Sequence, residues 1–233
     1  MIAHKQKFFT GVVMLIGFAV VLGLLFASIY PGPNNTKQNG LNYLDSLYNS
    51  ISKDSANYIP MVREKAAEYA ATPVTATLTM TNEKSASETA LLFEKAGVEV
   101  KTTGNEVAVN GTMGQILDNC LADAQSMYNN DGKTIRAKYG MDERVVVYGW
   151  YKALKVLAKD LNHQKKFKDA KMVDLTIKKA VELAYNYYHI EPVKISNCVG
   201  LVTFSLVFYV IYTLWFGFSV LFMFEGWGLK LEH

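Results

Sequence analysis

Residues 199–227 read VGLVTFSLVFYVIYTLWFGFSVLFMFEGW, an apolar run that contains a single charged residue, Glu225. A helix needs about 20 apolar residues to cross the hydrocarbon core of a bilayer. The run therefore predicts a transmembrane helix. Because Glu225 comes near the end of the run, we expect its carboxylate at the membrane edge, solvated by water.

A second apolar run lies near the other end of the chain, at residues 8–30 (FFTGVVMLIGFAVVLGLLFASIY), and carries no charge. The apolar core of a cleavable signal peptide has only about 7–15 residues. This longer run is therefore interpreted as an uncleaved signal anchor and a first transmembrane helix. Lys5 and Lys7 precede it, and positive flanking charges favour a cytoplasmic N-terminus.

The predicted topology is that of a bacterial inner-membrane protein with both ends in the cytoplasm. Residues 1–7 and 228–233 are the expected cytoplasmic ends. Residues 31–195 are expected to form one extracytoplasmic (periplasmic) domain. The last three residues, 231–233, resemble the start of a vector-encoded histidine tag, so we give them no functional weight.

The charged residues are nearly balanced, with 24 Lys+Arg against 21 Asp+Glu and a formal net charge of +3. A nucleic-acid-binding domain is usually far more basic, so no nucleic-acid partner is expected. Neither Cys120 and Cys198 nor the four histidines fall in a CxxC, CxxCH or HExxH spacing, which zinc, haem and zincin sites use. The sequence therefore predicts no enzyme, no cofactor and no metal site. A disulfide between the two cysteines stays open, since an oxidising compartment permits one.

The middle of the chain predicts a membrane-anchored α+β fold whose domain contains a small β-α-β-β-α unit. Residues 75–80 (TATLTM) alternate apolar and polar side chains, which is typical of a half-buried strand. Ser85 or Ser87 is the expected cap of the next helix, which stops at Gly97. Further helices are expected at residues 41–53, 57–71 and 113–129.

A β-hairpin is predicted from strands at residues 98–103 and 106–110. The dipeptide Gly104-Asn105 supplies a two-residue turn between them. That loop length pairs Val100 with Val109 and brings the apolar residues of both strands to one face. The turn and the apolar pattern thus specify the same register.

Two long helices, at residues 142–163 and 168–189, are predicted to form an antiparallel helical hairpin. Their apolar residues recur at steps of four and three, the pattern of helices packed lengthwise. Aromatic clusters at 148–151 (YGWY) and 185–188 (YNYY) fit core packing between these helices, with a ligand cradle as the alternative. The hairpin lysines form either a solvated face or a basic surface for an anionic partner or lipid headgroups. They are Lys152, Lys155, Lys159, Lys165, Lys166, Lys168, Lys171, Lys178 and Lys179.

Both predicted spans carry features of helix–helix packing. The first contains a small-xxx-small pair, which permits close helix approach. The aromatic residues of the second recur at steps of three and four down one face. We predict that partner spans pack against Gly23, Ala27, Phe208, Tyr209, Tyr212 and Trp215.

These patterns favour a non-catalytic structural or accessory subunit of a membrane complex. Its expected partners are integral membrane protein subunits and the lipid bilayer, in a homo- or hetero-oligomer. The alternative is an extracytoplasmic ligand-binding sensor or transport accessory protein. The six residues after the second span leave no room for an output module, so a sensor would signal through a partner helix.

Overall fold

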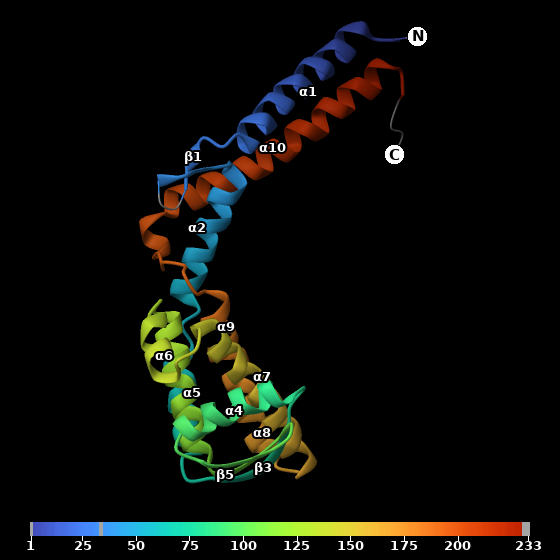
Figure 1. Ribbon diagram of the computed structural model, residues 1–233. Helices are drawn as coiled ribbons and strands as arrows, with labels where there is room; N and C mark the ends of the chain where they lie inside the picture. Colours follow the sequence, from blue (N-terminus) through green and yellow to red (C-terminus); the bar gives the residue numbers. More distant parts are fainter. Residues whose placement is uncertain (1, 33–34, 230–233) are drawn as a thin grey trace. The chain divides into compact units, whose positions relative to one another are not determined.

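The computed structural model describes residues 2–32 and 35–229 (Figure 1). Pro33 and Asn34, near the start of the predicted extracytoplasmic domain, and residues 230–233 of the predicted cytoplasmic C-terminus lie outside the described residues. The chain divides into two compact units, a terminal unit (Met1–Asp54 with Pro192–His233) and a middle unit (Ser55–Glu191). The compact middle unit thus begins at Ser55, whereas the sequence places the start of the middle domain at residue 31.

The terminal unit is built on two long helices, α1 (Lys5–Phe26) and α10 (Val199–Gly226), which run antiparallel and side by side (Figure 1). Both are long and apolar enough to cross a membrane, and only 6% of the most apolar stretch of each is buried. These helices are compatible with membrane association. The remaining elements of the unit are β1 (Tyr30–Pro31), β2 (Lys37–Gln38), α2 (Gly40–Ser55) and the 3-10 turn η3 (Ile195–Asn197).

Helix α1 ends four residues before the end of the predicted span. Ala27 leaves the helical conformation with φ −68° and ψ 134°. Tyr30 precedes Pro31, and a residue before proline favours extended backbone. The Tyr30–Pro31 segment pairs with Lys37–Gln38 instead of continuing the helix.

The middle unit contains a three-stranded antiparallel sheet in the order β3-β5-β4. Val100 lies opposite Val109 and Thr102 opposite Val107, which confirms the predicted hairpin register. Leu78 of the first strand is buried on the face that helices cover, while its neighbouring threonines are exposed. The strands are β3 (Pro73–Thr79), β4 (Glu99–Thr103) and β5 (Glu106–Thr112).

The helices of this unit supply most of its core. They are α3 (Ile59–Ala67), α4 (Glu83–Lys95), α5 (Met113–Tyr128), α6 (Gly132–Tyr139), α7 (Glu143–His163), α8 (Phe167–Thr176), the π-helical turn η2 (Ile177–Val181) and α9 (Glu182–Asn186). Trp150 of α7 is fully buried and meets the Phe93 ring of α4 edge-to-face at 5.6 Å.

The first residue of α4 differs from the prediction. Neither Ser85 nor Ser87 caps the helix. The side chain of Asn82 does, because its oxygen accepts a hydrogen bond from the Ser85 N–H at 2.8 Å. Ser85 lies one turn inside the helix and is buried. Asparagine and serine are about equally favourable as N-caps. Residue type alone therefore does not decide between Asn82 and Ser85, which lie within one helical turn of each other.

Helix α6 is a second difference, since none of the predicted helices covers residues 132–139. The Asp131 carboxylate caps it by accepting hydrogen bonds from the N–H of Thr134 at 3.3 Å and from its hydroxyl at 2.6 Å. Gly140 ends it with a φ of +69°, a left-handed conformation that glycine adopts at low cost.

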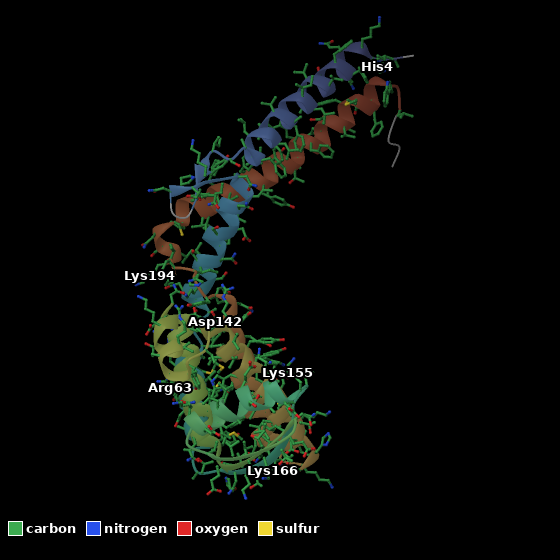
Figure 2. The ribbon with its side chains drawn as sticks, viewed as in Figure 1. His4, Arg63, Asp142, Lys155, Lys166 and Lys194 are labelled. Atoms are coloured by element: carbon green, nitrogen blue, oxygen red, sulfur yellow. The ribbon has the colours of Figure 1, made fainter. Side chains whose placement is uncertain are left out.

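Helix α7 begins as predicted, because the Asp142 carboxylate accepts a hydrogen bond from the Arg144 N–H at 2.9 Å (Figure 2). Helices α7 and α8 pack against each other. The second long helix, however, is not continuous over residues 168–189. The π-helical turn η2 interrupts it, and its last α-helical residue is Asn186. A π-helical turn inserts an extra residue and so re-aims the side chains that follow it.

Candidate functional site

The aromatic face of α10 packs against α1 of the same chain at two of the predicted partner-packing residues. The Tyr212 ring stacks on the Phe18 ring at 4.2 Å, and its hydroxyl donates to the Phe18 carbonyl at 3.2 Å. The Trp215 indole N–H donates to the Met14 carbonyl at 3.0 Å. A Cβ at Gly17 would lie 2.9 Å from the Trp215 ring, so this glycine makes room for the indole. These contacts join the two helices into one hairpin.

The structure distributes the other predicted packing residues differently. Phe208 is half-buried and stacks on the Tyr212 ring at 5.4 Å. Tyr209 is 68% exposed. Gly23 is exposed, and a Cβ there would have no neighbour within 4 Å among the described residues, while Ala27 lies past the end of α1. The Gly23–Ala27 pair therefore takes no part in the contact between the two helices of this chain.

Small residues at other positions make the close approach between α1 and α10. Gly11 is buried, and a Cβ there would lie 2.7 Å from the carbonyl oxygen of Ser219. Gly226 likewise faces the backbone of Phe8, and a Cβ at this glycine would lie 2.6 Å from the Phe8 Cα. The sequence contains no local signal that separates Gly11 from Gly23, because the choice depends on which side of α1 faces α10.

An ion pair closes the open end of this hairpin. Lys7 Nζ lies 2.7 Å from Glu225 Oε2, and the His4 N–H donates to the Gly226 carbonyl at 2.9 Å. The sequence predicted that the Glu225 carboxylate is solvated by water. In the structure it is instead paired with Lys7 of the first helix. Both side chains are more than one-third exposed, and exposed pairs add at most about 1 kcal/mol.

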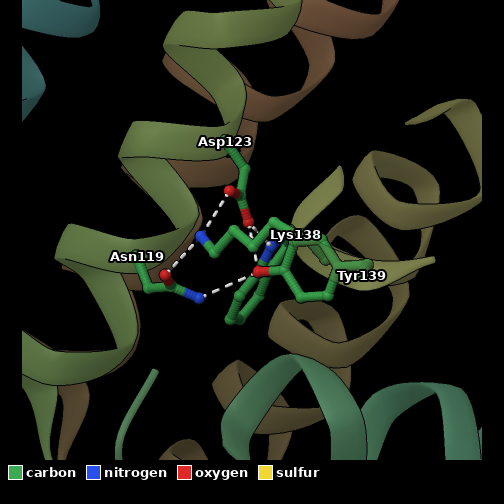
Figure 3. Close-up of polar contacts among 5 residues, drawn as sticks. Asn119, Asp123, Lys138 and Tyr139 are labelled. Carbon is green, nitrogen blue, oxygen red and sulfur yellow. Dashed lines mark hydrogen bonds and ion pairs between the residues drawn. The ribbon is translucent and has the colours of Figure 1, made fainter. Parts of the chain in front are cut away.

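A buried carboxylate is the centre of the most extensive polar cluster in the middle unit (Figure 3). Asp123 of α5 is 3% exposed. Its Oδ1 accepts from Lys138 Nζ at 2.6 Å, and its Oδ2 accepts from the Tyr139 hydroxyl at 2.5 Å and from the Trp150 indole N–H at 2.8 Å. Asn119 completes the cluster, bonding Lys138 at 2.6 Å and the Tyr139 hydroxyl at 3.0 Å. We call these five residues the Asp123 clamp.

The Asp123 clamp fixes α6 to α5 and α7. Burial and the neighbouring Asp123 carboxylate raise the pKa of Tyr139, so its hydroxyl remains a donor. All three donors to the carboxylate are side chains of the fold itself. The arrangement suits structural support rather than reaction with a substrate. Cys120, one turn before Asp123, is a buried thiol whose pKa burial raises.

A second buried carboxylate holds the other side of α6. Glu143 accepts a hydrogen bond from the Tyr188 hydroxyl at 2.6 Å and pairs with Arg136 at 2.9 Å. The Tyr188 hydrogen bond lowers the pKa of Glu143. Burial, together with Glu143, raises the pKa of Tyr188 to about 12. A Cβ at Gly132 would lie 2.8 Å from the Glu143 carboxylate, so glycine opens α6 at this contact.

The aromatic clusters are divided between core and surface. Trp150 and Tyr188 are buried, as core packing predicts. Tyr148, Tyr151 and Tyr185 instead line an open cavity of about 340 Å³ between α7 and the η2–α9 segment. We call this cavity the tyrosine pocket. Its remaining lining residues are Val147, Val181, Glu182 and Asn186.

The tyrosine pocket has the composition of a ligand site, with apolar and aromatic walls and few polar groups. The rings of Tyr148 and Tyr151 are nearly parallel, at 14° and 5.8 Å between centroids. The Tyr185 ring is tilted by 44° from that of Tyr148 at 6.1 Å. The η2 turn places Val181 and Glu182 at the pocket, and π-helical turns are frequent at functional sites. In the sequence, the YGWY and YNYY clusters were the features that pointed to this pocket, as the possible ligand cradle.

The hairpin lysines do not form one continuous basic surface. Lys152 and Lys155 lie over tyrosine rings of the pocket, and Lys179 lies over the Tyr58 ring at 4.4 Å. Three other hairpin lysines, together with Lys65 of α3, line a groove between α3 and α8 with a volume of about 630 Å³. That groove also contains Glu68 and Asp174, which offset part of the lysine charge. Its lysines are Lys65, Lys168, Lys171 and Lys178.

Other candidate chemistry finds little support in the geometry. Cys120 and Cys198 are both free thiols. Among residues 2–32 and 35–229, no group of three or more His, Cys, Asp or Glu is arranged to hold a metal ion. Comparison of the chain with protein-family models, curated proteins and solved structures finds no match. The described residues thus offer two candidate functional surfaces, which are the tyrosine pocket and the outer faces of α1 and α10.

Proposed function

We propose that this protein is a non-catalytic accessory subunit of a membrane complex. Helices α1 and α10 span the membrane as a hairpin, and their outer faces pack against integral membrane protein subunits. The hairpin leaves large apolar side chains exposed, among them Val13, Phe204 and Phe216. An apolar surface of this kind needs lipid or other spans to cover it.

The main support for the proposal is the exposed side chain of Tyr209. It is 68% exposed and lies about 15 Å along α10 from Val199. No hydrogen bond to its hydroxyl is found among residues 2–32 and 35–229. An unsatisfied polar group is costly in hydrocarbon, whereas the hydroxyl of Tyr212 already has the Phe18 carbonyl as its acceptor. A neighbouring span that offers a backbone carbonyl or a polar side chain would satisfy Tyr209.

The proposed topology keeps both ends of the hairpin on one side of the membrane. An antiparallel pair of spans requires this, and the positive charges of Lys5 and Lys7 favour the cytoplasm. The middle unit then lies on the extracytoplasmic side of a bacterial inner membrane. Fusions of a periplasm-active phosphatase within residues 81–84 and after residue 229 test this arrangement. Phosphatase activity is expected only for the internal fusion.

Gentle solubilisation followed by co-purification tests the subunit role. The native protein is expected to elute in a stable assembly with other membrane proteins. Tyr209→Phe, which removes only the hydroxyl, is expected to weaken that assembly while leaving the α1–α10 hairpin intact. Leu206→Val is the matched control, because Leu206 is also an exposed apolar position on α10. Elution of the native protein as a clean monomer or homodimer would contradict the proposal.

Ligand binding by the middle unit is the second candidate function, as in a sensor or transport accessory protein that acts through a partner. The tyrosine pocket favours it, since its volume of about 340 Å³ and mixed lining match small-molecule sites. Thermal stabilisation of the full-length protein across a metabolite panel tests it. The absence of any shift across cationic, neutral and anionic compounds would count against a ligand-binding role.

A further inference from the structure

The tyrosine pocket combines aromatic faces with one acidic group. Three rings, those of Tyr148, Tyr151 and Tyr185, surround it, and Glu182 supplies the carboxylate in its lining. The face of an aromatic ring carries negative electrostatic potential and attracts cations within about 6 Å of its centroid. Several rings beside a carboxylate are the arrangement that binds ammonium groups, including quaternary ones.

The chain already places ammonium groups on these rings. Lys155 Nζ lies 4.5 Å from the centroid of the Tyr151 ring, and Lys152 Nζ lies 5.2 Å from that of Tyr148. Lys155 lies on α7, and its side chain is exposed (Figure 2). Tyr151 first, and then Glu182 among the neighbouring carboxylates, raise the pKa of Lys155. Two lysine ammonium groups of the same chain thus already lie within cation–π distance of rings that line the pocket.

Lys152 is held more firmly than Lys155. Its Nζ also reaches the Ser85 hydroxyl at 3.4 Å. Lys155 has the Tyr151 ring and the field of Glu182 as its partners, and its side chain is exposed. Lys155 is not a lining residue of the pocket and reaches it only through the Tyr151 ring, whereas the three tyrosines of the pocket lie on helices α7 and α9.

We propose that the tyrosine pocket binds an organic ammonium group and that the Lys155 ammonium competes with it for the Tyr151 ring when no ligand is bound. The ammonium rests against the tyrosine rings beside Glu182, and Lys155 swings into solvent as the ligand enters. The inference rests on the second candidate function, ligand binding by the middle unit. It names the chemistry of the ligand, which a soluble solute or a lipid headgroup can carry.

Isothermal titration of the full-length protein in a maltoside detergent, with tetramethylammonium as the probe, tests the proposal. The Tyr148→Leu/Tyr185→Leu variant is expected to bind about tenfold more weakly, since each ring contributes about 2- to 5-fold. Glu182→Gln is expected to weaken binding as well. Lys155→Met is expected to tighten it several-fold, because the internal competitor is gone.

Tyr58→Leu is the matched control for loss of a tyrosine. Its ring also carries a lysine ammonium, Lys179 at 4.4 Å, but it lies outside the pocket. This variant is expected to bind the probe like the native protein. Equal binding by the native protein and the Tyr148→Leu/Tyr185→Leu variant, or weaker binding by Lys155→Met, overturns the proposal. Circular dichroism of each variant checks that the fold is retained, and Lys155→Met keeps the test decisive if the leucine variant unfolds.

Repeating the titration in nanodiscs separates the two ligand sources. A weaker apparent affinity in phosphatidylcholine nanodiscs than in phosphatidylglycerol nanodiscs identifies the lipid headgroup as a competing ligand. Equal affinity in both identifies a soluble ligand, and either result supports the site. Absence of tetramethylammonium binding in every preparation overturns the ammonium assignment alone. A thermal shift with a neutral or anionic compound would then still support ligand binding by the middle unit.

Discussion

Replacing Asp123 with alanine is expected to destabilise the middle unit more than any single change of an exposed carboxylate. The substitution removes the acceptor for three donors at once, on Lys138, Tyr139 and Trp150. Lys138 is 27% exposed at its side chain and can turn to water. Trp150 is fully buried, so its indole N–H is left without an acceptor.

The magnitude follows from these partners. A buried donor that loses its acceptor costs about 1–3 kcal/mol, and both the indole N–H and the Tyr139 hydroxyl are affected. Breaking a buried ion pair from one side costs about 3–5 kcal/mol in total. We therefore expect the free energy of unfolding to fall by about 4 kcal/mol. With a urea dependence of about 2 kcal/mol per molar, the unfolding midpoint falls by about 2 M.

Pulse proteolysis of the full-length protein in urea measures this change through cleavage within residues 55–191. Asp118→Ala is the control, because Asp118 is an exposed carboxylate on the same helix and is expected to change stability by less than about 0.5 kcal/mol. Asp123→Asn keeps the volume and one acceptor, so an intermediate loss is expected. If Asp123→Ala were as stable as the Asp118 control, the clamp would not support α6 and the reasoning would be refuted.

Two further predictions concern the helix hairpin and pH. Gly11→Ala is expected to lower thermal stability in detergent by about 1–3 kcal/mol, because the new Cβ meets the α10 backbone, whereas Gly23→Ala has open space and should be neutral; equal effects would place the helix contact elsewhere. The lowered pKa of Glu143 means that its stabilising contribution is present above its ordinary pKa of 4.5 and is lost as pH falls through the folded value. The raised pKa of Tyr188 gives the opposite limb, with stability present below pH 10 and lost as pH rises from 10 to about 12. In urea midpoints measured across pH, Tyr188→Phe is expected to lose the alkaline limb that Tyr188 contributes and to show a weaker acid limb, because Arg136 still lowers the pKa of Glu143. An unchanged profile would contradict the assignment.

Local sequence signals predicted the elements that short-range chemistry specifies. The hairpin register follows from a two-residue turn at Gly104-Asn105 and from the alternation of valines, and the structure confirms it. The start of α7 follows from Asp142, whose carboxylate reaches backbone N–H groups only a few residues away. The two long apolar helices follow from composition alone, because about 20 uncharged residues in a row have few other stable environments.

Elements that depend on distant residues escaped the sequence. Helix α6 has only Ile135 and Tyr139 as buried apolar side chains, a pattern too short to predict. Its stability comes from Asp123 and Glu143, which lie on neighbouring helices. The η2 turn has the same origin, since nothing in the order of its residues marks a π-helical insertion. The side on which each tyrosine of the two aromatic clusters lies depends on that insertion and on how α7 meets it.

The sequence by itself therefore determined two apolar helices at the ends of the chain, a small α+β domain between them, and the register of its hairpin. Each of these depends on contacts within a few residues or on the apolar length of one segment. Only the tertiary structure decided that Tyr212 and Trp215 serve the chain's own first helix while Tyr209 faces outward. It also decided that three tyrosines from both clusters meet around Glu182. These outcomes depend on helix rotation and pairing, which are set by the summed packing of residues far apart in the chain.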